Sequence, residues 1–109
     1  MVPTNQFNLV IIGAVPGGYA AAFLAADIGL GVTLIDEETN PGGVCLYRGC
    51  IPSKALLHVA HVISEAKAAK HLGVEFPAPK ITIDRVRSWR QEVVNKLTGG
   101  LGILCKQRK

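Results

Sequence analysis

The spacing of hydrophobic and polar positions differs between the first and second halves of the chain. Residues 7–12 form a short apolar run rich in β-branched side chains, which is typical of a strand buried on both faces. Glycines follow within 13–18, and the alanine-rich residues 19–26 then predict a helix that Gly29 can end. Residues 32–35 predict a second strand. Because a helix and short turns join the two strands, we expect a parallel sheet and an α/β fold.

In the second half of the chain the apolar positions recur at helical spacing. A broad apolar face over residues 55–69 predicts a long helix that begins near Ile51, packs under the segment before it and ends at Gly73. Pro52 suits the first turn of that helix, where a missing backbone N–H is tolerated. Prolines make residues 77–79 a loop.

A second helical segment follows this loop. Residues 81–83 predict a brief extended piece, and Asp84 can then cap a helix that runs to about Thr98. Glycines at 99, 100 and 102 weaken the helical pattern beyond that point.

Composition and charge narrow the class of protein. With 49% hydrophobic content, 109 residues are enough for one small core and too few for two, so residues 1–109 are expected to be one domain or part of one. The net charge is +4, and residues 80–109 hold eight of the twelve lysines and arginines. These cations alternate with apolar positions, which indicates a solvated helix face rather than a nucleic-acid site. Without a signal-peptide pattern or a membrane-length apolar run, we expect a cytoplasmic protein that binds no membrane.

The glycine cluster between the predicted strand and helix has the pattern of a dinucleotide-binding turn. Gly13 and Gly18 match the first and last glycines of G-x-G-x-x-G, and Asp36 lies 23 residues after Gly13, where an acid can accept hydrogen bonds from a ribose. Val15 replaces the middle glycine. Its isopropyl group would stand where the backbone approaches the pyrophosphate, and we therefore expect it to weaken nucleotide binding.

Cys45 and Cys50 carry the most specific chemistry in the sequence. In a regular helix, five residues separate side chains by about 140° around the axis, so one cysteine must leave the helix if the sulfurs are to bond. Nearby glycines, among them Gly42, Gly43 and Gly49, provide the backbone freedom for that distortion.

The surroundings of Cys50 favour a reactive sulfur. A helix that begins near Ile51 points its positive end at Cys50, and Lys54 follows one turn later, so both favour a thiolate. Cys105, the third cysteine, has no obvious partner. We therefore favour redox chemistry at Cys45 and Cys50 over a static disulfide.

A zinc site is an alternative use of these cysteines. His58 and His61 lie three positions apart on the predicted helix and could complete a Cys₂His₂ set. Only seven residues separate Cys50 from His58, which is shorter than the spacing of finger-like sites. The spacing of the cysteines and histidines therefore argues against a zinc site, and we expect no bound metal.

The residues around the cysteines resemble a known family. The run GGVCLYRGCIPSKALL at 42–57 closely resembles the active-site segment of the dihydrolipoamide dehydrogenases, which are flavin-dependent disulfide oxidoreductases. The opening strand and turn, residues 66–68 and residues 97–101 also look like the bacterial members. The resemblance covers essentially the whole chain, but only an N-terminal part of the family's length. It implies an α/β fold that is the incomplete N-terminal part of a Rossmann-like FAD-binding domain.

The resemblance implies catalytic roles near the cysteines. Cys45 would exchange with the dihydrolipoyl dithiol, Cys50 would face the flavin as a charge-transfer thiolate, and Lys54 would lie beside the flavin ring. Tyr47 and Arg48 depart from the residues that the family usually has between the two cysteines.

The resemblance also implies a cofactor site. Gly13, Gly17 and Gly18 would hold the FAD pyrophosphate. Asp36, where the family usually has glutamate, would bind the adenosine ribose. Val15 departs from the family at this site, which again predicts weaker FAD binding.

The whole enzyme implied by the resemblance would use FAD as bound cofactor and NAD⁺ as co-substrate, and would be a homodimer. Its partners would be dihydrolipoyl groups of 2-oxo acid dehydrogenase complexes or of the glycine cleavage protein. The 109 residues lack the family's NAD-binding and interface domains, so alone they are expected to be inactive. Reductases of glutathione or mercuric ion share the cysteine spacing, and a zinc-stabilised binding module is the alternative from another class.

Overall fold

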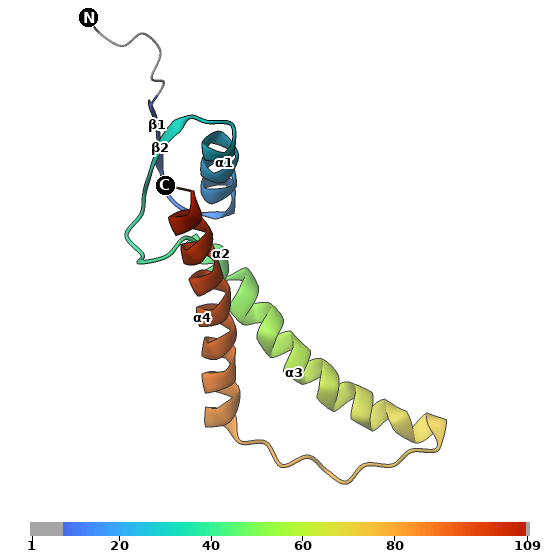
Figure 1. Ribbon diagram of the computed structural model, residues 1–109. Coiled ribbons are helices and arrows are strands. Elements are labelled where there is room, and N and C mark those ends of the chain that lie inside the picture. The colour runs from blue at the N-terminus through green and yellow to red at the C-terminus, as the bar shows by residue number, and fades with distance from the viewer. Residues whose placement is uncertain (1–7, 109) are drawn as a thin grey trace, which may run out of the picture.

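A computed structural model describes residues 8–108 and shows a small sheet from which two long helices extend (Figure 1). Strands β1 (Asn8–Ile12) and β2 (Gly31–Ile35) pair in parallel, with Val10 opposite Thr33. Helix α1 (Pro16–Asp27) joins them. This confirms the α/β fold and the parallel pairing; residue 7, predicted to open the first strand, lies outside the described residues.

Helix α1 is longer than the sequence predicted. It begins at Pro16 rather than at residue 19, because proline suits the first helical turn, where its missing N–H has no partner to lose. Gly29 adopts φ +90° just after the helix, and its N–H donates to the Ala26 carbonyl oxygen at 3.0 Å. This confirms Gly29 as the end of the helix.

The predicted long helix is preceded by a short one. Helix α2 (Gly43–Tyr47) is followed by α3 (Cys50–Ala68), which continues as a 3-10 turn (Ala69–Leu72). Gly73 ends it in the left-handed conformation, as predicted. The apolar face of α3 does not pack along its length: only Pro52 and Ala55 in its first turns are buried.

The last helix, α4 (Ile83–Gln107), corrects the sequence prediction at both ends. Thr82 rather than Asp84 precedes the helix, and residues 81–83 form no strand. The helix also continues well past Thr98, because Thr98 and Gly102 are buried against the rest of the chain. Tertiary packing therefore overrides the weak helix propensity of the glycines.

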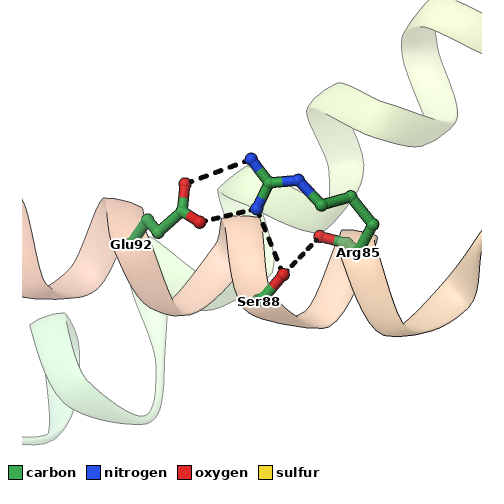
Figure 2. A network of polar contacts seen from close by, with 3 residues as sticks. All are labelled: Arg85, Ser88 and Glu92. Carbon is green, nitrogen blue, oxygen red and sulfur yellow. Dashed lines mark hydrogen bonds and ion pairs between the residues drawn. The ribbon is translucent and has the colours of Figure 1, made fainter.

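Helix α4 carries an exposed group of polar contacts among the charges that the sequence assigned to solvent. Arg85 Nη1 donates to Glu92 Oε1 at 2.5 Å and to Ser88 Oγ at 3.1 Å (Figure 2). The hydrogen bond with Glu92 holds the pKa of Arg85 above its ordinary value. All three side chains are exposed.

Burial is concentrated where the helices meet the sheet. Helices α3 and α4 contact each other beside α2 and then diverge (Figure 1). The prediction that the first strand is buried on both faces is wrong for this chain, since Val10 is 55% and Ile12 84% exposed. Two strands with one covering helix leave part of the sheet without a neighbour. Within residues 8–108, none of the helices has both the length and the apolar content needed to cross a bilayer.

Candidate redox and nucleotide site

The two cysteines lie on separate helices. Cys45 is in the middle of α2 and Cys50 is the first residue of α3. The prediction that one cysteine leaves the helix is therefore wrong. Both cysteines are helical, and the helix itself breaks between them, at Arg48 and Gly49. A Cβ on Gly49 would lie 3.1 Å from the Val44 carbonyl oxygen, so a side chain at this position would crowd the end of α2.

Two further glycines begin α2. Gly42 has φ +155° and Gly43 has φ +58°, which confirms that the chain uses their conformational freedom before Cys45. The Gly42 N–H donates to the Ala14 carbonyl oxygen at 2.8 Å. This hydrogen bond joins the start of the cysteine segment to the glycine turn.

The two sulfurs are neighbours and both thiols are free. The pKa of Cys45 is raised above its ordinary value, first by a hydrogen bond with the Cys50 thiol and then by desolvation. Lys54, one turn further along α3, acts in the opposite direction through its charge. The raised pKa means that Cys45 keeps its proton to higher pH than a free thiol does.

The glycine turn is built around close backbone contacts. Gly13 has φ +96°, and its N–H donates to the Ile35 carbonyl oxygen at 2.7 Å. A Cβ on Gly18 would collide with the Gly13 carbonyl oxygen, so Gly18 lets α1 pack against the turn. These contacts explain why the turn needs glycine at both positions.

The start of α1 has the features of an anion site. No side chain caps it, and a Cβ on Gly17 would meet nothing within 4 Å, so the backbone there can be approached closely. These residues fit a pyrophosphate. Val15, the residue before the helix, is 45% exposed and adopts ordinary extended angles of φ −66° and ψ 168°. A Cβ on Gly43 would lie 2.6 Å from Val15 Cγ1, so the valine side chain packs directly onto the start of α2.

Asp36 is held by the turn itself. The Ala14 N–H donates to Asp36 Oδ2 at 2.6 Å, and the Glu38 N–H donates to Oδ1 at 2.9 Å. The pKa of Asp36 is lowered by these hydrogen bonds, the one from Glu38 first. The ionised carboxylate therefore orders the turn, a task that the sequence did not reveal.

The structure brings the glycine turn, Asp36 and the cysteine pair together through Ala14. Sequence reasoning missed this residue, which is 1% exposed. Its N–H binds Asp36 and its carbonyl oxygen binds Gly42. Because the backbone makes both hydrogen bonds, the alanine side chain gives no signal in the sequence.

The histidines of the zinc alternative serve other contacts. The His58 ring lies 6.1 Å from the Trp89 ring between centroids, and His61 Nε2 lies 3.6 Å from Glu65 Oε1. Among residues 8–108, no three His, Cys, Asp or Glu side chains gather as metal ligands would. The described residues thus provide no Cys₂His₂ set.

Comparison with known proteins decides the family. The family model described as pyridine nucleotide-disulphide oxidoreductase matches residues 7–109. The chain belongs to this family. The cysteine pair and the glycine turn lie within the matched residues.

Three curated relatives with high identity to this chain share one name. A dihydrolipoyl dehydrogenase of Vibrio cholerae is 55% identical over 102 residues, which are 94% of this chain and 22% of the relative. The dihydrolipoyl dehydrogenase of Haemophilus influenzae is 54% identical over 102 residues, covering 94% of this chain and 21% of the relative. One from Staphylococcus aureus is 49% identical over 104 residues, covering 95% and 22%. The chain spans about a fifth of the length of these pyridine nucleotide-disulphide oxidoreductases.

Proposed function

We propose that residues 1–109 are part of the FAD-binding domain of a disulfide oxidoreductase that oxidises dihydrolipoyl groups with NAD⁺. The observation that carries the proposal is the pair of neighbouring free thiols, Cys45 and Cys50, at the junction of two helices beside a glycine turn. The name shared by the relatives supports dihydrolipoyl groups over glutathione or mercuric ion as the substrate.

The cysteines would react by thiol–disulfide exchange. A dihydrolipoyl thiolate attacks Cys45 Sγ of the Cys45–Cys50 disulfide, forms a mixed disulfide and releases Cys50 as a thiolate. The second lipoyl thiolate then attacks the lipoyl sulfur of the mixed disulfide, which forms the lipoyl disulfide and releases Cys45. Two electrons and two protons thus pass from the dithiol to the pair, which leaves a lipoyl disulfide and two reduced cysteines.

The remaining site residues would hold the cofactor. Gly13 and Gly17 leave the backbone at the start of α1 open to a pyrophosphate, Gly18 lets that helix pack against the turn, and Asp36 is an ionised acceptor for a ribose hydroxyl. Lys54, exposed on α3 one turn from Cys50, would lie near the flavin ring. When bound, FAD supplies the two-electron acceptor for the reduced pair, with NAD⁺ as the final oxidant. The whole enzyme would act as a homodimer on lipoyl groups of 2-oxo acid dehydrogenase complexes or of the glycine cleavage protein.

A chimera tests this function. Residues 7–109 replace the matching segment of the Vibrio cholerae relative, and lipoamide-dependent reduction of NAD⁺ is measured. We expect activity that is lost when either Cys45 or Cys50 is changed to serine. Cys105→Ser is the matched control and should retain activity. A folded, flavin-loaded chimera that reduces NAD⁺ equally well with Cys45→Ser would contradict the proposal.

A further inference from the structure

The two residues next to the helix break between the cysteines reach away from the sulfurs. The Tyr47 hydroxyl donates to the Asn40 carbonyl oxygen at 3.1 Å, and Arg48 Nη2 lies 2.6 Å from Glu38 Oε1. Both partners belong to the segment 38–42, which lies between β2 and α2. The end of α2 is therefore attached to the segment from which that helix begins.

The segment 38–42 is itself held firmly. A Cβ on Gly102 of α4 would collide with the Asn40 side chain, and a Cβ on Gly42 would lie 3.2 Å from both Thr98 Cγ2 and Tyr47 Cε2. Pro41 and Gly42 are buried. The Tyr47 and Arg48 contacts thus connect α2 to a packed part of the molecule rather than to a free loop.

Helix α2 is too short to keep its orientation by itself. It has five residues, too few to be stable alone, and glycines lie at its start and at the break that follows it. We propose that Tyr47 and Arg48 are positioning residues that hold Cys45 within bonding reach of Cys50. The inference rests on the proposed redox role of the pair.

The relevant reaction is formation of the Cys45–Cys50 disulfide against glutathione. Each cysteine loses a proton, and the two sulfurs together give two electrons to glutathione disulfide, which becomes two glutathione thiols. The equilibrium constant of this reaction measures how well the protein holds the two sulfurs together. Loss of a positioning contact should lower it.

Tyr47→Phe tests the first contact, because it removes the hydroxyl and keeps the ring. In the 109-residue chain, equilibrated with glutathione and quenched by alkylation, we expect the constant to fall about two- to tenfold, the range for one neutral hydrogen bond. The chain has one other tyrosine, Tyr19, which packs beside Phe23 on α1. Tyr19→Phe is the matched control and should leave the constant unchanged.

Charge reversal tests the second contact. Arg48→Glu should lower the constant, and combining it with Glu38→Arg should restore it, most clearly at low salt. A purely structural role predicts a change in the folded fraction by circular dichroism instead, with the glutathione equilibrium of the folded chain unmoved. The glutathione equilibrium is measured again with the same variants in the chimera. The result then does not depend on how the 109-residue chain behaves alone.

Two negative results have different meanings. If the unchanged chain forms no Cys45–Cys50 disulfide at any glutathione ratio, the proposed redox function fails. If it forms one whose equilibrium constant is the same in Tyr47→Phe and Arg48→Glu, the positioning inference fails and the proposed function stands.

Discussion

Val15 links the candidate nucleotide site to the cysteine segment at the scale of a single side chain. It precedes α1 at the candidate phosphate site and packs onto Gly43 at the start of α2. The turn tolerates valine without positive φ. The valine side chain therefore reduces the space available to a ligand and does not strain the backbone.

We expect Val15→Gly in the chimera to tighten FAD binding. Recovering one or two phosphate hydrogen bonds at about 1.5–3 kcal/mol each corresponds to one to several orders of magnitude in affinity. Flavin fluorescence titration of the apoprotein measures it. Val44→Gly, on the exposed face of α2, controls for the flexibility of an added glycine. Equal affinity with Val15 and with glycine would show that the steric argument is wrong.

Asp36 should make the stability of the turn depend on pH in the acidic range. Its folded pKa is lowered, so its contribution is complete above the unfolded pKa of about 3.9 and is lost as the pH falls through the folded value. Thermal midpoints of the chain and of Asp36→Asn should therefore differ by a constant amount between about pH 5 and 7 and converge below about pH 3.9. Glu37→Gln, an exposed neighbour, should show no such convergence. A gap that widens on acidification would oppose this assignment.

These residues show how far the sequence could predict the site. Gly13 and Gly18 could be recognised in the turn because a steric requirement restricts the residue type at each position. Cys45 and Cys50 are neighbours in the structure, and their redox role stays a prediction. The role of Ala14 could not be recognised, because its contacts come from the backbone, which every residue has.

Helix α4 illustrates the same limit at the scale of an element. Local signals favoured an end near Thr98, yet the helix runs to Gln107 because Gly102 lets it approach Asn40. A sequence pattern reports propensity within one element and contains no information on a partner many positions away. The strands and the parallel sheet were predictable because their pattern is local.

The glycines of α4 can be separated by substitution. Gly99→Ala and Gly100→Ala should stabilise the chain by roughly 0.5–1 kcal/mol, because a Cβ at either position meets nothing within 4 Å. Gly102→Ala should destabilise it by about 1–3 kcal/mol despite the same gain in helix propensity, because the methyl group collides with Asn40. Urea unfolding of the three variants measures both signs. Stabilisation by all three would mean that the Asn40 contact is not close in solution.

The whole molecule is more extended than a compact domain of its size. Its radius of gyration is 20.6 Å, compared with about 13 Å for a compact chain of 100 residues. Large apolar side chains are exposed on the sheet and on the helices, among them Ile12 of β1 at 84%, Leu24 of α1 at 64% and Leu57 of α3 at 66%. Such surfaces in the described residues are typical of faces that pack against further protein.

We therefore expect the 109-residue chain to self-associate when it is alone. At micromolar concentration it should elute above its monomer mass with light scattering, and it should bind the dye ANS more strongly, per chain, than the chimera does. In the chimera the additional domains should cover part of this surface. A strictly monomeric chain that does not increase ANS fluorescence would show that the exposed side chains are solvated individually.

The contact between the end of α4 and helix α1 has a consequence for the order of folding. Arg108 Nε donates to Asp27 Oδ1 at 2.8 Å across 81 positions, and the guanidinium lies 4.7 Å from the centre of the Phe23 ring. Contacts between distant positions form only after a large loss of loop entropy. During synthesis, the strands and α1 emerge long before the helix that carries Thr98 and Gly102. The cysteine segment consequently reaches its packed form last, after a period in which both thiols are open to oxidation with the wrong partner.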